Sequence, residues 1–178
     1  MNQKKTFLVH GRFQPFHNGH LWLVTEALTR AEHVIIGICT PEICTPEVAE
    51  KTGYPCTAEQ NPFTHEERAR MISNSLSEAK VESGQYTCIP FPSDYKSIPA
   101  EVPADTVFLL CVANEADTRK ADYIRALGYI VETIRIPDIR TESGSHIRSL
   151  ITSNDPAWHN LVPPATYSVI TSRFEAKQ

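Results

Sequence analysis

The sequence has 178 residues and a formal net charge of −4, so it lacks the basic excess that nucleic-acid-binding domains carry. No apolar run approaches the ~20 residues that span a bilayer, and the amino terminus has no apolar segment of the kind found in secretion signals. The five cysteines include no C-x-x-C pair, which favours reduced thiols. We therefore expect one cytoplasmic domain over residues 1–178, with no nucleic-acid or membrane partner.

Short β-rich runs alternate with helix-like segments along the chain. Strands are predicted at 6–10, 33–39, 86–91, 106–113 and 129–134, and helices at 19–31, 64–80 and 115–128. The runs 6–10, 33–39 and 106–113 are continuously apolar, as is typical of strands that are buried on both faces of a parallel sheet. This order predicts an α/β fold with a doubly wound, mostly parallel, Rossmann-like sheet in a single domain. A C-terminal helical segment is expected at about 143–172.

Local signals mark the ends of two of these helices. Thr64 and Glu67 form the capping-box pattern at the start of the segment 64–80. Gly128 is a helix stop at the end of the segment 115–128, because glycine readily adopts the left-handed conformation that follows many helices.

Two proline-containing stretches, residues 40–63 and 90–105, interrupt the alternation and predict long loops. Long loops within a compact domain are usually functional or mobile. Cys39, Cys44 and Cys56 could form a zinc site with a nearby histidine. Their spacing matches no common ligand pattern, so reduced cysteines are the favoured interpretation.

The segment GRFQPFHNGH, residues 11–20, follows the first predicted strand. It therefore lies at the carboxyl edge of the sheet, where doubly wound proteins bind ligands. Gly11 lets the backbone come close to a ligand. Asn18 and Gly19 open the next helix, whose free N–H groups and dipole attract anions. The segment is thus a candidate phosphate-binding loop.

Side chains of the same segment strengthen this interpretation. His17 and His20 are three residues apart, so near a helix start they can face the same point. Arg12 can add a bidentate contact to an anion. Two imidazoles, a guanidinium and a helix start together predict a phosphate clamp, whereas a loop of merely solvated histidines is the alternative.

A second motif, SGSHIR, occupies residues 143–148. A Ser-Gly-Ser turn before a helix offers the hydroxyls of Ser143 and Ser145, together with backbone N–H groups, to phosphate oxygens. Arg148 lies about one turn into that helix and can reach the same oxygens. The alternative is an ordinary helix N-cap followed by an exposed arginine.

Both motifs resemble those of a known enzyme superfamily. G-R-F-Q-P-x-H-x-G-H at 11–20 resembles the (H/T)-x-G-H nucleotidyltransferases and, among them, the archaeal-type nicotinamide mononucleotide adenylyltransferases. SGSHIR is similar to the superfamily's I-S-x-(S/T)-x-I-R signature, with Glu142 in place of an apolar residue. Three further segments are similar to that family, so that the resemblance spans most of the chain: NPFTHEERARMI at 61–72, ANEADTRKADYIRALGYIV at 113–131 and WHNLVPPATYSVI at 158–170.

The resemblance implies nucleotidyl transfer from ATP to nicotinamide mononucleotide, which yields NAD and pyrophosphate. It also implies Mg²⁺ bound mainly through the nucleotide phosphates, without assigned protein ligands, and a homo-oligomeric enzyme. The residues expected to act in catalysis are Arg12, His17, His20 and Arg148. The residues expected to bind the nucleotide are Gly11, Arg12, Phe13, His17, Gly19, His20, Asn114, Ser143, Ser145 and Arg148. Asn114 could contact the base or ribose, or it could cap the helix that follows it.

Two loops differ from the family pattern where the acceptor ring would lie. The stretch 40–63 is longer than the corresponding family loop, and 90–105 lacks the tryptophan that stacks on nicotinamide there. Asp94 and Tyr95 are the expected acceptor contacts, with Tyr95 stacking in place of the tryptophan. Two alternatives therefore stay open. One is a related enzyme, such as a cytidylyltransferase, with a different phosphorylated or phosphonate acceptor, and the other is a non-catalytic nucleotide-sensing domain.

Overall fold

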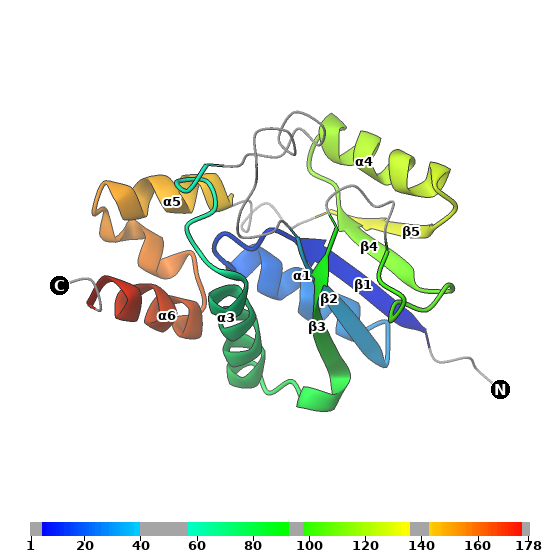
Figure 1. Cartoon of the computed structure of the whole chain (residues 1–178), viewed down its shortest axis with the longest axis horizontal. Coiled ribbons are helices and arrows are strands. Elements are labelled where there is room, and N and C mark those ends of the chain that lie inside the picture. Colours follow the sequence, from blue (N-terminus) through cyan, green and yellow to red (C-terminus); the bar gives the residue numbers. More distant parts are fainter. Residues whose placement is uncertain (1–4, 40–56, 93–97, 136–142, 176–178) are drawn as a thin grey trace.

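The fold is built on a five-stranded sheet, which Figure 1 shows in the computed structural model of the chain. The structure describes residues 5–39, 57–92, 98–135 and 143–175, which we call the described residues. The strands are β1 (Thr6–Gly11), β2 (His33–Cys39), β3 (Tyr86–Phe91), β4 (Val107–Cys111) and β5 (Ile130–Ile134). Their order is β3-β2-β1-β4-β5, and all neighbouring pairs are parallel. The predicted doubly wound α/β fold is therefore confirmed.

The helices of the described residues also follow the predicted order. They are α1 (Asn18–Leu28), α3 (His65–Glu78), α4 (Glu115–Ala126), α5 (Gly144–Thr152) and α6 (Pro164–Glu175), with the 3₁₀ turns η1 (Ser83–Gln85) and η3 (Pro156–Asn160). The capping box at α3 is confirmed, because Thr64 Oγ1 accepts from the Glu67 N–H at 3.1 Å and Glu67 Oε2 accepts from the Thr64 N–H at 2.8 Å. Gly128 follows α4 with φ of 94°, as a helix stop requires.

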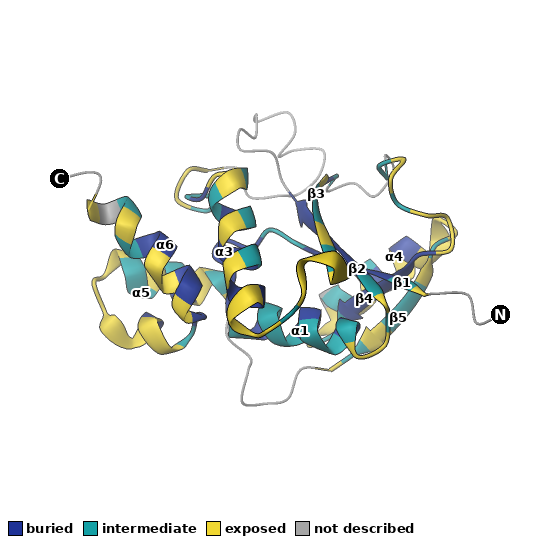
Figure 2. Ribbon diagram, turned by 90° about the horizontal axis from the view of Figure 1, so that it is seen from below, coloured by how far each residue is buried: buried dark blue, intermediate teal, exposed yellow. Residues whose placement is uncertain are grey.

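Helical layers cover both faces of the sheet, and the alternation along each strand divides the core between them. Phe7 and Val9 of β1 pack with α1 and α3, whereas Leu8 packs with α4. All three side chains are at most 2% exposed. Figure 2 shows that buried residues (dark blue) gather in the strands and on the inner sides of the helices. Burial on both faces explains why the strand sequences are continuously apolar.

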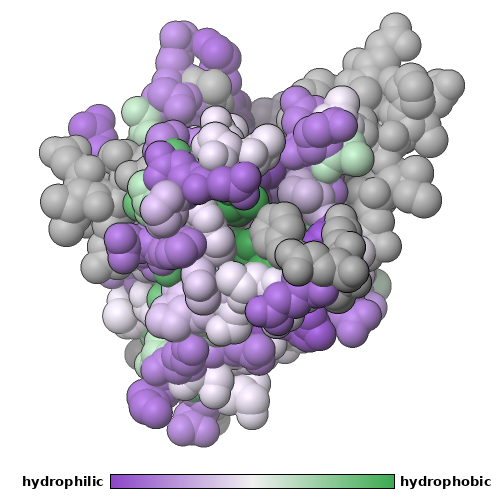
Figure 3. Space-filling model, turned by 90° about the vertical axis from the view of Figure 1, so that its left-hand side faces the viewer, coloured by the Kyte–Doolittle hydropathy of each residue, from purple (hydrophilic) through white to green (hydrophobic). Residues whose placement is uncertain are grey.

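The described chain from residue 143 to 175 forms a helical group of α5, η3 and α6 at one end of the molecule (Figure 1). Helix α6 packs against α3: the Ala165 N–H donates to Glu78 Oε2 at 3.0 Å, and the buried hydroxyls of Ser75 and Thr166 lie 3.4 Å apart. Figure 3 views the molecule from this end, where the described surface is mainly hydrophilic or intermediate around a small recessed hydrophobic area. The C-terminal segment is therefore fastened to α3.

Parts of both long loops, residues 40–56 and 93–97, lie outside the described residues. Asp94 and Tyr95, the expected acceptor contacts, are among them, and so are Cys44 and Cys56 of the zinc alternative. Within the described portion of the chain, no helix is long and apolar enough to cross a membrane.

Candidate active site

The switch point of the sheet lies beside β1. From β1 the chain builds β2 and β3 on one side and then crosses over to β4 and β5 on the other side. Ligands of doubly wound proteins bind at such a point, beyond the carboxyl ends of the strands. The loop at residues 12–17 continues from the carboxyl end of β1 and leads directly into α1. The first predicted motif therefore occupies the expected position.

His17 and His20 face each other at the start of α1. Their rings stack with centroids 3.6 Å apart and an angle of 26° between the planes. The His17 N–H donates to His20 Nδ1 at 3.3 Å, so the neutral His20 ring carries its proton on Nε2. The predicted pairing of the two imidazoles is thus present, and His20 Nε2–H is a donor for a ligand.

Burial keeps both imidazoles neutral at pH 7. It lowers the pKa of His17 from 6.5 to about 4. Burial, and to a smaller extent His17, lowers the pKa of His20 well below its usual value. His17 Nδ1 is buried and has no hydrogen-bond partner among the described residues. An anion placed beside these rings would favour their charged forms and raise both pKa values.

Two guanidinium groups lie near each other at the same loop. Arg12 Nη1 is buried without a hydrogen-bond partner among the described residues. Burial, and to a smaller extent the charge of Arg12, lowers the pKa of Arg148. Within the described part of the chain, neither arginine forms an ion pair with a carboxylate. Like charges held together without a counter-ion are typical of a site that binds an anion.

Helix α5 joins the second motif to the first. Arg148 Nη1 donates to the Gln14 carbonyl at 2.6 Å, across 134 positions of sequence. Gly144 packs so closely on the loop that a Cβ added there would lie 2.8 Å from the Gln14 oxygen. Ser143 Oγ accepts from the His146 N–H at 3.2 Å and lies 3.0 Å from Ser145 Oγ. The N-cap interpretation of Ser143 is confirmed, and the predicted meeting of the two motifs is observed.

The start of α1 corrects one expectation. The sequence predicted that the N–H of Asn18 would be free for an anion, but this N–H donates to the Leu161 carbonyl at 3.1 Å. The Asn18 side chain donates to the Asn160 carbonyl at 2.9 Å. The prediction is wrong for this group, because the turn after η3 satisfies it from within the protein.

Asn114 caps α4, one of its two predicted roles. Its Oδ1 accepts from the Asp117 N–H at 3.1 Å. In return, Asp117 Oδ2 accepts from the N–H groups of Ala113 at 3.0 Å and Asn114 at 3.2 Å. The capping role is confirmed, whereas a contact to the base or ribose stays a prediction.

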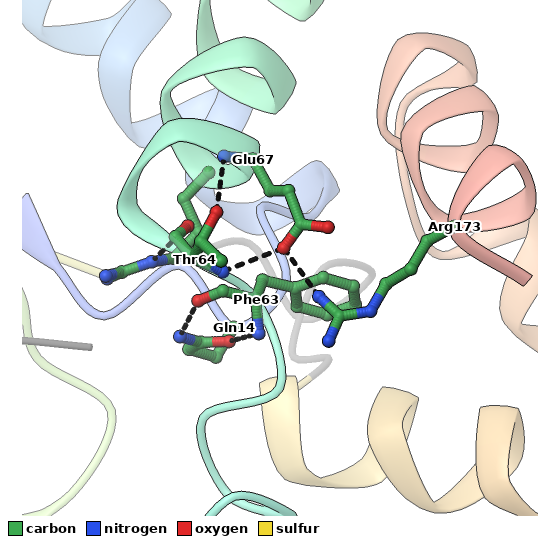
Figure 4. Close-up of polar contacts among 6 residues, drawn as sticks. Gln14, Phe63, Thr64, Glu67 and Arg173 are labelled. Atoms are coloured by element: carbon green, nitrogen blue, oxygen red, sulfur yellow. Dashed lines mark hydrogen bonds and ion pairs between the residues drawn. The ribbon is translucent and has the colours of Figure 1, made fainter. Parts of the chain in front are cut away.

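Gln14 and Arg68 organise the loop, and the sequence analysis assigned neither of them a role. The Gln14 amide holds both backbone groups of Phe63: Nε2 donates to its carbonyl at 2.8 Å, and Oε1 accepts from its N–H at 3.0 Å (Figure 4). We call this pair of bonds the Gln14–Phe63 clamp. Arg68 is 1% exposed and donates to the carbonyls of Arg12 and Cys39, both at 2.8 Å. Both residues belong to motifs quoted above, but a motif does not distinguish a group that binds backbone from one that binds ligand.

On the other face of the sheet, His10 and Lys120 approach the strand ends. His10 is 8% exposed and stacks on Phe91 with ring centroids 5.4 Å apart. Burial, followed by the charge of Lys120, lowers the pKa of His10. Burial also lowers the pKa of Lys120, while Cys39 and Asp117 oppose this effect. His10 is therefore a neutral aromatic residue of the core, and Lys120 is a partly buried cation near the switch point.

Metal ligands do not cluster in the described portion of the chain, where no three histidine, cysteine or acidic residues are placed to hold an ion. Burial raises the pKa of the Cys39 thiol to about 12, which disfavours the thiolate that zinc requires. The other two cysteines of the zinc alternative lie outside the described residues. The side chains gathered at the candidate site are thus cationic or neutral donors, and they suit an anion that brings its own metal ion.

Comparison with known proteins gives matches along nearly the whole chain. The sequence model of the cytidylyltransferase-like family matches residues 8–149, a range that includes both motifs. A phosphonoformate cytidylyltransferase of Streptomyces viridochromogenes is 33% identical over 169 residues, which cover 93% of this chain and 90% of the relative. A nicotinamide-nucleotide adenylyltransferase of Thermococcus kodakarensis is 32% identical over 162 residues, with coverage of 89% and 78%.

Solved structures share the fold. A bifunctional NMN adenylyltransferase/ADP ribose pyrophosphatase from Francisella tularensis superposes with a TM-score of 0.62 at 19% identity. The match covers 85% of the present chain but only 43% of that chain, so the present chain spans less than half of that protein. At this level of identity the similarity concerns the fold alone.

Proposed function

Because the chain belongs to the cytidylyltransferase-like family, we propose that it transfers a nucleotidyl group from a nucleoside triphosphate to the phosphate of a small acceptor. The preferred reaction joins ATP and nicotinamide mononucleotide into NAD and pyrophosphate, which the motif resemblance and the Thermococcus kodakarensis relative support. The observation that carries the proposal is the contact between the first loop and α5, where Arg148 donates to the Gln14 carbonyl. This contact brings two guanidinium groups, which have no carboxylate partner among the described residues, to the end of β1.

The proposed chemistry needs no nucleophile from the enzyme. An oxygen of the acceptor phosphate attacks the α-phosphorus of the triphosphate and forms a new P–O bond. The bond from the α-phosphorus to the bridging oxygen breaks, and its electrons leave with pyrophosphate. The enzyme has to align the two substrates and to neutralise the charge that develops on the leaving group.

The described side chains suit these two tasks. Arg12, Ser145 and Arg148 would hold the outer phosphates, where the leaving charge gathers. His17 and His20 would bind nearer the reacting centre, with His20 Nε2–H donating to the α-phosphate. Their lowered pKa values make them neutral donors before the nucleotide binds. The triphosphate then draws them towards the charged form, which strengthens the same contacts.

Mg²⁺ fits this site only when it is coordinated by the phosphates of the nucleotide. The side chains gathered here are imidazoles, guanidinium groups and hydroxyls, which are poor ligands for a hard cation, so the phosphate oxygens would hold it. When bound there, Mg²⁺ adds further neutralisation of the phosphate charge. The protein's own contribution is to place the triphosphate and to shield it from water.

The acceptor side of the proposal rests on the sequence. Asp94 and Tyr95 would contact the acceptor, with Tyr95 stacking on the pyridine ring. We further propose that the enzyme is cytoplasmic, where both phosphorylated substrates occur, and that it is a homo-oligomer, as the family resemblance implies. Size-exclusion chromatography of the purified protein, with light scattering to give the molar mass, tests the proposed homo-oligomer.

A second candidate reaction has a specific observation in its favour. The Streptomyces viridochromogenes relative, 33% identical over 93% of this chain, is named for CTP and a phosphonate. A phosphonate presents the same set of oxygens as a phosphate ester, so His17, His20, Arg12 and Arg148 would act unchanged. The two reactions differ in the base and in the size of the acceptor. Those differences fall on the 40–63 and 90–105 loops.

A pyrophosphate-release assay that crosses two triphosphates with two acceptors tests the proposal. Purified protein with Mg²⁺ receives ATP or CTP together with nicotinamide mononucleotide or phosphonoformate, and products are identified by mass. We expect pyrophosphate and NAD from ATP with nicotinamide mononucleotide. Turnover of CTP with phosphonoformate alone would select the second candidate. Triphosphate binding without turnover in any arm would favour a nucleotide-sensing domain instead.

A further inference from the structure

The Gln14 carbonyl accepts a hydrogen bond from Arg148, and it needs a fixed position if Arg148 is to hold a triphosphate. Arg148 Nη1 donates to the Gln14 oxygen at 2.6 Å, so one edge of the guanidinium is anchored to the loop. The remaining N–H groups of the fork keep a direction that is set by this anchor. Any movement of the Gln14 backbone would turn Arg148 with it.

The Gln14–Phe63 clamp fixes that backbone. Gln14 is 3% exposed, and its amide bonds to both backbone groups of Phe63, 49 positions away. Phe63 in turn immediately precedes the N-cap of α3, Thr64. The position of the Gln14 carbonyl therefore depends on where the first turn of α3 begins.

The last helix fastens that first turn. In Figure 4, Arg173 of α6 reaches across to Glu67 and lies beside the Phe63 ring. Arg173 Nη1 contacts Glu67 Oε2 at 2.5 Å, and the same oxygen accepts from the Thr64 N–H at 2.8 Å. The guanidinium carbon of Arg173 lies 5.5 Å from the centre of the Phe63 ring. One cation thus engages both the cap and the clamped residue.

We propose that Arg173 is a positioning residue for nucleotidyl transfer. Through Glu67 and the Gln14–Phe63 clamp, it fixes the carbonyl that aims Arg148 at the triphosphate. This inference rests on the function proposed above. It extends the set of residues that position the candidate site to helix α6.

The partial burial of the ion pair gives it the strength that this role requires. The side chains of Arg173 and Glu67 are 26% and 18% exposed, so the pair is screened less than a surface pair. A pair of similar length joins Arg30, in the turn after α1, to Glu26 in the last turn of that helix at 2.6 Å. It is more exposed, at 36% and 30%, and lies at the other end of α1 from the loop. Arg30→Gln is therefore the matched control.

The test measures triphosphate affinity by calorimetry in the absence of acceptor, because binding does not depend on which acceptor is used. The titrated nucleotide is the one that supports turnover. If neither does, ATP and CTP are each titrated. Arg173→Gln is expected to raise the triphosphate dissociation constant about fivefold. Glu67→Gln keeps an amide oxygen for the Thr64 N–H and should match Arg173→Gln. Because the two residues act through one contact, the double variant should be no worse than either single variant.

Two further variants separate positioning from simple loss of stability. Arg173→Lys keeps the charge and should restore most of the affinity. In an Arg148→Lys background, Arg173→Gln should change the triphosphate affinity by less than twofold. Lysine has no guanidinium for the Gln14 carbonyl to orient, so the position of that carbonyl no longer matters for binding. Arg30→Gln should leave the affinity of the wild-type background unchanged. Urea unfolding of each variant shows whether stability follows the same order.

Each outcome decides between the alternatives. Unchanged affinity in Arg173→Gln overturns the inference while the proposed function stands. A fivefold loss that persists in the Arg148→Lys background also overturns it, because the effect then bypasses Arg148. If the wild-type protein binds a triphosphate but transfers nothing, the proposed function fails and the positioning test still holds through binding. If it binds neither ATP nor CTP, both fail.

Discussion

Two helix starts meet the candidate phosphate-binding loop at residues 12–17, and their hydrogen bonds differ. At the start of α1, the N–H of His17 bonds to His20 and the N–H of Asn18 bonds to the Leu161 carbonyl. At the start of α5, Ser143 accepts the N–H groups of His146 and Ile147, which belong to the same helix, and its hydroxyl lies 3.0 Å from that of Ser145. A distant segment therefore takes up an N–H group at the α1 start, which leaves the two imidazoles as its main side-chain donors. These bonds of Ser143 at the α5 start are local to that helix, and this start carries hydroxyls and Arg148.

This difference shows what a helix N-terminus does and does not imply. Local sequence predicts where a helix begins, but it does not reveal whether a distant segment has already satisfied its first N–H groups. Here the turn after η3, more than 140 positions away, satisfies the N–H of Asn18. An anion at the α1 start would therefore depend largely on the imidazole donors of the two histidines there.

The largest expected effect tests the side-chain role of the α1 start. His20→Ala should lower turnover by at least ~100-fold, because it removes a donor to charge that develops in the transition state. The triphosphate KM should change much less. Steady-state kinetics give both values, and circular dichroism checks that the fold survives. Near-normal turnover would show that the α1 start binds the nucleotide by some other group.

The second prediction concerns the protonation of His17 at the start of α1. The folded protein keeps His17 neutral down to pH of about 4, whereas the unfolded chain takes up this proton near pH 6.5. The contribution of His17 to the free energy of unfolding, measured without nucleotide, should therefore be fully present above pH 6.5 and should be lost as the pH falls towards 4. The difference between the two pKa values corresponds to at most about 3 kcal/mol.

Urea unfolding measured at intervals between pH 4 and 7 checks this prediction. His17→Gln should flatten part of the slope, because glutamine binds no proton in either state. His146→Gln, at an exposed position of α5, is the control and should keep the slope. Equal slopes in the wild type and in His17→Gln would mean that the imidazole at the α1 start is not held neutral.

The third prediction tests the close packing of the α5 start. In Gly144→Ala the new Cβ would lie 2.8 Å from the Gln14 carbonyl and 3.4 Å from Arg148 Nη1. Backbone cannot give way as a flexible side chain does, so α5 should shift from the loop and carry Arg148 with it. We expect the triphosphate KM to rise roughly tenfold, since small misplacements of binding groups are costly.

Gly84→Ala provides the matched control, because a Cβ at Gly84 meets no atom within 4 Å. The same kinetic assay applied to both variants separates packing from the general effect of replacing a glycine. If Gly144→Ala keeps the wild-type KM, the closeness of α5 to the loop does not matter for binding. The contributions of the α1 and α5 starts to triphosphate binding would then be more alike than their contacts indicate.

The sequence predicted the fold well because its signals are local. Continuously apolar runs identified the buried parallel strands, and Thr64 with Glu67 identified the start of α3. Helix α1 ended at Leu28, three residues early, because the chain closes there with bonds from Thr29 to Glu26 and from Arg30 to Ala27. The apolar Ala31 continued the helical pattern but belongs to the turn before β2.

The site was predicted in part, for a related reason. The motifs identified the residues that meet at the loop, such as His20 and Arg148. They could not reveal that Gln14 binds Phe63 or that Arg68 binds the Arg12 carbonyl, since these contacts join segments 49 and 56 positions apart. A polar residue in a motif looks the same whether it binds a ligand or supports the backbone that does. Only the assembled fold separates these roles.

The smallest expected effect tests whether Asn18 supports the α1 start or binds the ligand. Its side chain donates to the Asn160 carbonyl, and its N–H donates to Leu161, so Asn18→Ala loses the first bond and keeps the second. Stability should fall by about 1 kcal/mol, the value of one such bond, while turnover stays within about twofold. Asn18→Asp removes the donor at the same size and should behave alike. A tenfold loss of turnover without a change in the urea midpoint would place Asn18 at the ligand, and the α1 start would then resemble the α5 start after all.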